Sequence, residues 1–376
     1  MTDSRRSLRH SSRFGIAAVA AAAALLAGGL SQSASAAAAV STTAAATDPA
    51  MNASPDVTTF SKGWSNPWGI AFLPDGASAL VTENETSRVF RLRDDGSRTQ
   101  VGKVPNVVVL QPGDDGVGGL LGVALSPSWD GKKDKSVFFM HTTASETRVV
   151  RMDYDGKALS GYTVLLDGIR RGSNHNGGRI AFGPDGYLYV ATGEATQAQL
   201  AQDKNSVNGK ILRITKTGAP APGNPFGNHI YSYGHRNPQG LAWDSKGRLW
   251  SSEIGQDATD ELNLIKPGAN YGWPRCEGTC DDDGMTNPKV TWDHTTAPAQ
   301  VAVVGDNLYV SSLRGFKLWR IPIDAVDEGK GNDEKTSVFS GYALRALAKV
   351  PGKNELWMGT SRNGDGDDRI LRVTIK

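Results

Sequence analysis

The sequence predicts an all-β fold, and within that class a six-bladed β-propeller. A short apolar block recurs along the chain at spacings of 53, 57, 61, 60 and 45 residues. A turn and a second strand-like segment follow most of these blocks, and helical periodicity is nearly absent. Repeats of this period built from short antiparallel strands are typical of propellers more than of sandwiches. The six copies are GIAF at Gly69, GVAL at Gly122, RIAF at Arg179, GLAW at Gly240, QVAV at Gln300 and RALA at Arg345.

Each repeat contains the sequence of several antiparallel strands. Turns such as LPDG, GPDG and DSKG follow the apolar block, and Pro, Asp and Gly favour tight hairpins. The segments after the turns, such as SALVTEN and YLYVATGE, are rich in residues that favour strands. Most repeats end in a further strand, namely SRVFRL, TRVVRM, GKILRI, FKLWRI or DRILRV. Six repeats over residues 58–376 predict one propeller whose radial closure hides the sheet edges. The alternative is a generic all-β chain with coincidental hairpins.

Residues 1–36 have the pattern of a secretory signal peptide. Four arginines precede an apolar run over residues 16–30, and residues 34–36 have the A-x-A form of a cleavage site. The adjacent Arg5 and Arg6 also fit twin-arginine export. The apolar run is short for a bilayer, and no later run is long enough for a membrane helix. We therefore expect a secreted protein with no membrane span.

Residues 37–57 are mainly Ala, Ser and Thr, which predicts a disordered spacer because such a segment cannot build a core. The leader carries four arginines and one aspartate, so its removal changes the formal net charge from +2 to −1. The mature chain is therefore near neutral. It contains no basic run and no interleaving of basic and aromatic residues, which argues against a nucleic-acid partner.

The two cysteines of the chain are Cys276 and Cys280, in the segment RCEGTC. In an exported protein this pair favours a disulfide. Zinc binding is the alternative, but two thiolates alone do not complete a tetrahedral site. A disulfide across so short a loop would mainly stiffen the local structure.

Two polar loops precede predicted first strands. His175 lies in RRGSNHNGG, just before the third repeat, and could take a proton near neutral pH. The alternative is a histidine that only makes surface hydrogen bonds. One repeat later, Arg236 and Asn237 lie in YGHRNPQG, where Arg236 could hold an anionic group. The alternative there is a turn stabilised by Asn-Pro and an arginine ion pair.

Other loops carry acidic or basic side chains. Residues 251–274 are dense in carboxylates and main-chain oxygens that suit calcium, without EF-hand spacing. A solvated acidic loop is the alternative. The segment NGDGDD near the C-terminus also resembles a calcium loop, although a plain turn is favoured. Arg314 and Arg345 lie at comparable edges of the fifth and sixth repeats. Together with Arg236 they would attract a multiply anionic ligand, whereas each alone could be an ordinary surface charge.

Four segments together resemble a known family. The chain is similar to soluble aldose dehydrogenases that use pyrroloquinoline quinone, the glucose/sorbosone dehydrogenase family of six-bladed propellers. The resemblance covers about residues 60–376, and GHRNPQG and DELNLI…NYGWP are its specific parts. The segments are HNGGRIAFGPDGYLYVATGE, GHRNPQGLAWD, SEIGQDATDELNLIKPGANYGWP and GDDRILRV.

The resemblance implies a secreted quinoprotein oxidoreductase that oxidises the anomeric carbon of an aldose sugar to a lactone. Hydride passes to pyrroloquinoline quinone, Ca²⁺ and an arginine polarise the accepting carbonyl, and the electrons go to an external acceptor. The chain has no CxxCH haem motif, so it carries no such electron carrier of its own.

By position in the matching motifs, His175 is expected to be the general base. Arg236 and Asn237 match cofactor contacts, with Arg236 near the reactive carbonyl. Arg314 stands where the family has a basic residue, often lysine, that holds the carboxylates of the quinone. Arg345 matches a second carboxylate-binding arginine.

The resemblance also implies two calcium sites. The main-chain oxygens of Gly255 and Gln256 fall where the family binds the calcium of the cofactor. Glu261 and the main-chain oxygen of Tyr271 fall where it binds a further, structural calcium. Gln199 is a candidate contact to substrate or cofactor.

Four positions depart from the family pattern. Val117 replaces a Gln or Glu that touches cofactor or sugar, and Ala343 replaces an arginine of some members. Asn174 precedes the histidine where some members have Asp, and Gln256 replaces a proline. We expect the losses at Val117 and Ala343 to lower cofactor affinity or to change the substrate.

Two alternative functions follow from the same sequence. The first is a non-catalytic secreted propeller that binds carbohydrate or a protein partner, which the departures at Val117 and Ala343 favour. The second is a calcium-dependent lactonase, which needs carboxylates and Asn side chains around a metal at the centre of the propeller. In this sequence the carboxylates instead cluster in one loop.

Overall fold

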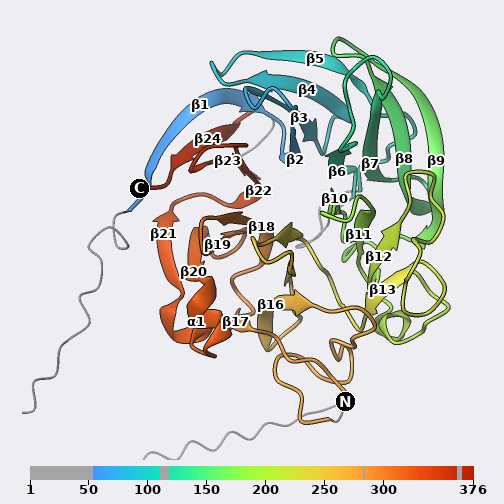
Figure 1. Ribbon diagram of the computed structural model, residues 1–376, viewed down its shortest axis with the longest axis vertical. Helices are drawn as coiled ribbons and strands as arrows, with labels where there is room; N and C mark the ends of the chain where they lie inside the picture. Colours follow the sequence, from blue (N-terminus) through green and yellow to red (C-terminus); the bar gives the residue numbers. More distant parts are fainter. Residues whose placement is uncertain (1–53, 111–117, 283, 362–365) are drawn as a thin grey trace, which may run out of the picture. The chain divides into compact units, whose positions relative to one another are not determined.

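Six four-stranded antiparallel sheets make up the folded part of the chain (Figure 1). The structure is a computed structural model, and it describes residues 54–110, 118–282, 284–361 and 366–376. Each sheet is one blade, and the blades follow one another in the sequence. The six-bladed β-propeller predicted from the repeats is confirmed.

The strands of the first three blades range from three residues in β10 to twelve residues in β9. Blade 1 contains β2 (Pro67–Phe72), β3 (Ser78–Glu83), β4 (Arg88–Arg93) and β5 (Arg98–Lys103). Blade 2 contains β6 (Leu120–Leu125), β7 (Ser136–Thr142), β8 (Glu146–Tyr154) and β9 (Leu159–Arg170). Blade 3 contains β10 (Ile180–Phe182), β11 (Leu188–Thr192), β12 (Lys210–Ile214) and β13 (Ile230–Tyr233), with the 3-10 helix η2 (Ala198–Ala201) between β11 and β12.

The last three blades include the two short α-helices of the described chain, both in blade 5. Blade 4 contains β14 (Ala242–Trp243), β15 (Leu249–Glu253), β16 (Thr259–Ile265) and β17 (Val290–Asp293). Blade 5 contains β18 (Pro298–Val304), β19 (Asn307–Ser312), β20 (Lys317–Pro322) and β21 (Thr336–Ser340), with α1 (Ile323–Asp327) and α2 (Gly331–Glu334) before β21. Blade 6 contains β22 (Leu344–Lys349), β23 (Glu355–Thr360), β24 (Asp368–Thr374) and β1 (Asp56–Trp64).

The ring is closed by the N-terminal strand. β1 pairs antiparallel with β24, from Asp56 opposite Thr374 to Trp64 opposite Asp368. The two ends of the folded chain therefore share one sheet. Because main-chain hydrogen bonds of the last blade depend on the first strand, closure protects the end of the chain from becoming a free sheet edge.

The recurring apolar blocks form the first strand of each blade, and the core lies between the blades. Each buried apolar cluster draws its residues mostly from two adjacent sheets. Between blades 6 and 1, for example, Trp64, Phe90 and Leu92 pack with Trp357 and Ile370. Side chains alternate between the two faces of a strand, so each blade can pack against both neighbours. Burial between blades is thus what fixes their radial order.

Several first strands break register with the second strand near one end. In blade 6 the pairing of β22 with β23 is interrupted between Leu344 and Leu347, and comparable interruptions occur in blades 1, 2 and 5. Such irregularities redirect side chains at the rim of a sheet. Arg345 lies within the interruption of blade 6 and is almost fully buried.

The structure describes only part of the N-terminal segment for which the sequence makes predictions. The signal peptide over residues 1–36 and most of the spacer lie outside the described residues. β1 begins at Asp56 and pairs there with β24, so residues 56 and 57 of the expected spacer belong to a strand, and the division of the chain into domains stays a prediction. Among the described residues, no helix has the length and apolar character needed to cross a membrane.

Candidate functional site

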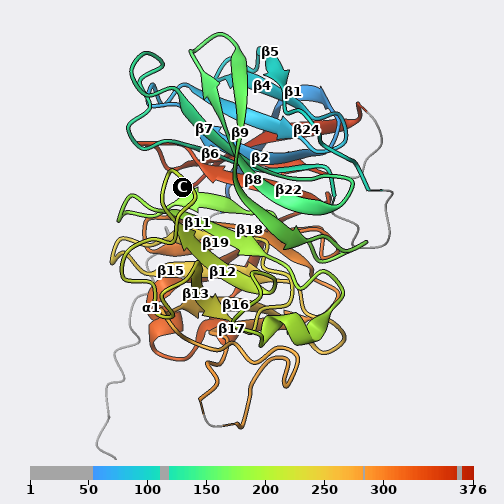
Figure 2. The same ribbon diagram turned by 90° about the vertical axis from the view of Figure 1, so that its right-hand side faces the viewer.

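The candidate residues lie on loops at one end of blades 3 and 4. In an antiparallel blade, the loop before the first strand and the loop after the second strand emerge at the same end. The loop before β10 carries His175, and the loop after β11 carries Glu194. The corresponding loops of blade 4 carry Arg236 and Gly255. Figure 2 shows blades 3 and 4 from the side, with β11, β12, β13, β15 and β16 labelled.

His175 is paired with a buried carboxylate. Its Nδ1 hydrogen-bonds Oε1 of Glu194, and the side chains of the two residues are 11% and 3% exposed. No hydrogen bond within the described part of the chain engages Nε2 of His175, which leaves this atom for chemistry. The backbone of His175 has a φ of +56°, a conformation uncommon for residues other than glycine and associated with functional sites.

Two glycines allow the His175 loop and the Glu194 loop to touch. A Cβ on Gly193 would lie 1.8 Å from the carbonyl oxygen of His175. A Cβ on Gly177 would lie 2.4 Å from the carbonyl oxygen of Ala191. Neither position tolerates a side chain, so the glycines of NHNGG and ATGE are required by close backbone approach. The result is that His175 and Glu194 are held by rigid backbone contacts.

Arg236 lies next to this pair. Its carbonyl oxygen accepts a hydrogen bond of 2.9 Å from the backbone N–H of Glu194. The Arg236 side chain is buried, donates from Nη1 to the carbonyl oxygens of Ile254 and Gly255, and lies 5.5 Å from the ring centroid of Trp273. The histidine pair and the arginine of GHRN are therefore brought together across two blades.

Asn237 and Gln239 connect the arginines to the His175 loop. Asn237 is fully buried, and its Oδ1 accepts from the backbone N–H of Gly177 at 3.2 Å and from Nε2 of Gln239 at 2.9 Å. Oε1 of Gln239 accepts from Nη1 of Arg345 at 2.8 Å. Nδ2 of Asn237 has no hydrogen-bond partner among the described residues. A buried donor of this kind is costly unless a ligand satisfies it.

A further arginine lies beside Arg345. Arg179 is 4% exposed, and its guanidinium lies 4.1 Å from the ring centroid of Trp68. Its Nε donates to the carbonyl oxygen of Gln239 at 3.0 Å. Burial, with a further contribution from the charge of Arg345, lowers the pKa of Arg179 to about 9. Two like charges removed from water favour an anionic group nearby.

The acidic loop of blade 4 is organised by a carboxylate outside it. Both oxygens of Glu277 accept hydrogen bonds from the backbone N–H groups of residues 256–259. Inside the loop, Asp260 accepts from the N–H of Gly255 at 2.9 Å and from that of Ala297 at 2.6 Å. Burial raises the pKa of Asp260 to about 6. These contacts fix the position of the carbonyl groups of Gly255 and Gln256.

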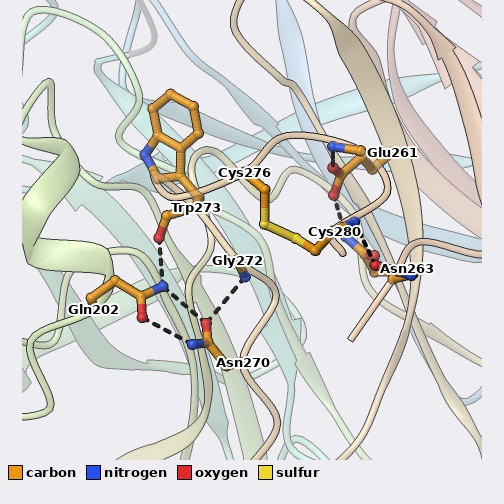
Figure 3. The surroundings of a disulfide bond; sticks show 10 residues. Gln202, Glu261, Asn263, Asn270, Gly272, Trp273, Cys276 and Cys280 are labelled. Atoms are coloured by element: carbon orange, nitrogen blue, oxygen red, sulfur yellow. Dashed lines mark hydrogen bonds between the residues drawn. A yellow bond between two sulfur atoms is a disulfide. The ribbon is translucent and has the colours of Figure 1, made fainter. Parts of the chain in front are cut away.

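The predicted disulfide between Cys276 and Cys280 is confirmed, with a Cα–Cα distance of 5.8 Å (Figure 3). The loop that it closes contains Glu277, described above, and Gly278, whose N–H donates to Oε1 of Glu261 at 2.7 Å. The other oxygen of Glu261 accepts from Nδ2 of Asn263 at 3.0 Å. The disulfide therefore lies beside two candidate calcium-binding regions.

Glu261 lies at a small enclosed void of about 10 Å³, which has room for roughly one water or ion. Burial and the carboxylate of Glu253 raise the pKa of Glu261. A cation in the void would relieve this cost. Within the described ranges, however, no three His, Cys, Asp or Glu side chains group as metal ligands. The calcium ligands expected in this region are the main-chain oxygens of Gly255, Gln256 and Tyr271, together with the carboxylate of Glu261. The void is lined by Arg236, Glu253, Gly255, Glu261, Tyr271, Trp273, Cys276 and Glu277.

Within the described chain, some of the residues predicted for the site are not linked by contacts to the cluster around His175 and Arg236. Gln199 is exposed in η2, and no side-chain hydrogen bond links it to the cluster. Arg314 is partly buried between β19 and β20, and its charge partly offsets the burial that raises the pKa of Asp260. Ala343 is buried just before β22. Val117 and the first half of the NGDGDD segment, residues 363–365, lie outside the described residues.

Sequence reasoning missed four residues of the site: Glu194, Arg179, Gln239 and Glu277. Glu194 and Gln239 lie inside motifs that carry the family resemblance, ATGE and GHRNPQG. No local pattern pairs Glu194 with His175, however, because 19 positions separate them in the sequence. In the sequence, Arg179 stands out only as the first residue of the apolar block RIAF. Glu277 stands out only by its position between the two cysteines.

A second histidine–glutamate pair, formed by His235 and Glu253, differs from the His175 pair in the hydrogen bonds of its ring. His235 bonds Oε2 of Glu253 through Nδ1 at 2.9 Å and Oγ of Ser232 through Nε2 at 2.8 Å. Its ring is fully buried and stacks on Tyr271 with centroids 4.6 Å apart. Both ring nitrogens are therefore engaged, and this pair is structural. Only the His175 pair keeps a ring nitrogen available.

Comparisons with known proteins agree with this geometry. The family model for glucose/sorbosone dehydrogenase matches residues 64–372. The PQQ-bound form of aldose sugar dehydrogenase from Streptomyces coelicolor is 43% identical, with a TM-score of 0.77 over 86% of this chain and 98% of that one.

Two further relatives support the same grouping. A putative oxidoreductase (glucose dehydrogenase) from Thermus thermophilus is 38% identical, with a TM-score of 0.77 over 85% of this chain and 99% of its own. Aldose sugar dehydrogenase YliI from Escherichia coli K12 is 32% identical over 264 residues, covering 64% of this chain and 67% of the relative. With its six blades and its paired His175, the chain belongs to the glucose/sorbosone dehydrogenase family.

Proposed function

We propose that the protein is an exported, calcium-dependent quinoprotein that oxidises the anomeric carbon of aldose sugars to lactones and passes the electrons to an external acceptor. The observation that carries the proposal is the buried His175–Glu194 pair beside Arg236. Family membership and the likeness to a PQQ-bound relative support the cofactor.

The residues present fit pyrroloquinoline quinone, which carries several carboxylates. Arg236 and Arg345 are buried at the ends of a hydrogen-bonded group that also contains Asn237 and Gln239. Nδ2 of Asn237 is a buried donor without a partner among the described residues, and Arg179 adds a second desolvated positive charge beside Arg345. Such a group favours a planar, multiply anionic ligand.

When bound, the quinone supplies a carbonyl carbon that accepts the hydride from the anomeric carbon. His175 takes the proton of the anomeric hydroxyl at Nε2, and Glu194 fixes the ring orientation and stabilises the positive charge that forms on it. Arg236 would lie at the accepting carbonyl, where a preorganised guanidinium stabilises developing negative charge. Arg314 and Arg345 would hold carboxylates, and Gln199 would contact sugar or cofactor.

Calcium fits the chain in two places. The carbonyl oxygens of Gly255 and Gln256 would hold the calcium of the cofactor, and Glu261 with the carbonyl oxygen of Tyr271 would hold the structural one. At the first place, the carbonyl of Gly255 already accepts from Arg236. A carbonyl oxygen has two lone pairs, so the Gly255 carbonyl could bind calcium and accept from Arg236 at the same time, which would link the metal to the position of Arg236.

The direct test uses the mature protein stripped with a chelator. Calcium and pyrroloquinoline quinone are added back, and dye reduction is measured across a panel of aldoses, with each component omitted in turn. Turnover that requires both additions is the expected result. The absence of both turnover and quinone binding, the latter measured by absorbance, would contradict the proposal. That result would favour a propeller that only binds carbohydrate or a protein.

A further inference from the structure

A groove lies between the outer parts of blades 4 and 5. Its volume is about 640 Å³, large enough for one or two sugar rings. Trp292 of β17 and Trp319 of β20 stand in its walls with ring centroids 6.1 Å apart. The groove is lined by Ala258, Thr259, Thr291, Trp292, Asp293, Thr295, Thr296, Arg314, Gly315, Lys317, Trp319 and Lys335.

The groove opens next to the candidate catalytic site. Ala258 and Thr259 line it, and they directly follow the loop that carries Gly255 and Gln256. Arg314 also lines the groove, and its charge acts on the carboxylate of Asp260, which accepts from the N–H of Gly255. A chain molecule with one end at His175 could therefore continue toward the groove without leaving this end of the propeller.

The charges in the groove are mainly positive. Nζ of Lys317 lies 5.0 Å from the ring centroid of Trp319, and Nζ of Lys335 lies 5.9 Å from that of Trp292. Arg314 adds a third positive charge. The acidic residue in the lining is Asp293, whose Oδ1 already accepts from the N–H and hydroxyl of Thr295. Nζ of Lys335 donates to the carbonyl oxygen of Thr291 at 2.6 Å and to Oδ1 of Asn332 at 3.0 Å. A carboxylate entering the groove would therefore meet a positive potential in which Lys317 is the lysine best placed to bind it.

We propose that this groove binds a uronic acid residue of an oligosaccharide whose reducing-end sugar is oxidised at His175. Trp292 is only 5% exposed, so the partly exposed indole of Trp319 supplies most of the apolar contact for the carbon skeleton of a pyranose, and the threonine hydroxyls suit its hydroxyl groups. The lysines would bind the carboxylate, and the charge of Arg314, which is expected to hold the quinone, would add to the positive potential of the groove. The proposal rests on the proposed sugar oxidation for the placement of the reducing end, whereas binding in the groove can be measured separately.

The first experiment measures binding without turnover. Holoenzyme prepared with calcium and quinone is titrated with the methyl glycoside of a glucuronic acid–glucose disaccharide, whose blocked anomeric centre cannot be oxidised. The neutral methyl cellobioside serves as the matched ligand. We expect the acidic glycoside to bind about five- to tenfold more tightly at low salt. This advantage should shrink at about 0.5 M NaCl, because salt screens partly exposed charges.

The second experiment removes one charge from the groove. Lys317→Gln should lose most of the preference for the acidic glycoside while affinity for the neutral one stays within about twofold. Lys349→Gln is the control, because Lys349 is an exposed lysine at the end of β22, outside the groove lining. Thermal unfolding of both variants checks that each is folded. Equal affinities for the two glycosides, or the same loss in both variants, would overturn the proposal.

Two results separate this inference from the proposed function. If glucose is oxidised normally but the two glycosides bind equally, the groove assignment is wrong and sugar oxidation stands. If the acidic glycoside is preferred and Lys317→Gln abolishes that preference, yet no aldose is oxidised, the groove is a carbohydrate site and the proposed oxidation is wrong.

Discussion

Nδ1 of His175 is bound to Oε1 of Glu194, and this contact joins the loop before β10 to the loop after β11. The carboxylate is 3% exposed, and its second oxygen has no hydrogen-bond partner among the described residues. A buried carboxylate that accepts from Nδ1 of a histidine fixes the orientation of the ring and its tautomer. Nε2 is then the nitrogen that faces the proposed chemistry, and we propose it as the base.

Glu194→Gln should lower kcat by about 100-fold or more with little change in KM, because the carboxylate acts when positive charge forms on His175. Steady-state kinetics on an aldose that wild-type protein oxidises provides the measurement. His175→Ala should cost at least as much, and the double variant should be no worse than His175→Ala. Additive losses would show that the two residues act independently.

Gln239→Leu should destabilise the protein by about 2–3 kcal/mol and weaken quinone binding. The substitution removes the acceptor of Arg345 and the donor to Asn237, and it leaves buried polar groups unsatisfied. Denaturant unfolding gives the stability change, and quinone titration by absorbance gives the affinity. Gln300→Leu is a matched control, since Gln300 bridges blades 4 and 5 through the backbone of Leu241. An equal loss of quinone affinity in the control would count against a specific role for Gln239.

Glu277→Gln should weaken calcium binding at the Gly255–Gln256 loop. Its carboxylate holds the backbone N–H groups of residues 256–259, and an amide would leave some of them without an acceptor. Isothermal titration of chelator-treated protein with calcium would show the change. The Cys276→Ser, Cys280→Ser double variant should also bind calcium more weakly, because the disulfide closes the loop that contains Glu277. Unaltered calcium affinity in both would mean that this loop does not bind the metal.

Removal of calcium should lower the melting temperature, and Glu261→Gln should reduce that calcium dependence. Glu261 is buried beside Glu253, so a bound cation stabilises the folded state by relieving repulsion between the two carboxylates. In the absence of calcium the variant should be as stable as wild-type protein or more so. A calcium-induced shift of wild-type size in Glu261→Gln would place the structural calcium elsewhere.

Lys210 should make stability rise with pH above neutrality. Burial lowers the pKa of Lys210 to about 7, while its Nζ donates to the carbonyl oxygens of Leu200, Ala201 and Asn208. Between that value and the ordinary lysine pKa the unfolded chain binds more protons than the folded one. The free energy of unfolding therefore increases with pH across this window. Lys210→Met should be less stable and should show a smaller slope in denaturant unfolding from pH 7 to 10. An identical slope would mean that Lys210 stays charged when folded.

The period of the apolar blocks and the turn residues between them determined the fold from sequence alone. Hairpin turns and alternating strands are local features, so residues a few positions apart suffice to specify each blade. The spacing of Cys276 and Cys280 was equally local and gave the disulfide. Resemblance of short motifs then pointed to His175, Arg236 and Asn237, which lie at one end of neighbouring blades.

The partners of these residues were decided only by the tertiary structure. Gln239 and Arg345 are 106 residues apart, and the lining of the groove comes from both blade 4 and blade 5. Such contacts exist because radial closure brings particular loops to the same end, which no local pattern encodes. The start of β1 at Asp56 has the same origin, since its polar sequence forms a strand by pairing with β24 at the far end of the chain. Local propensity specified the blades, and burial between blades specified the site.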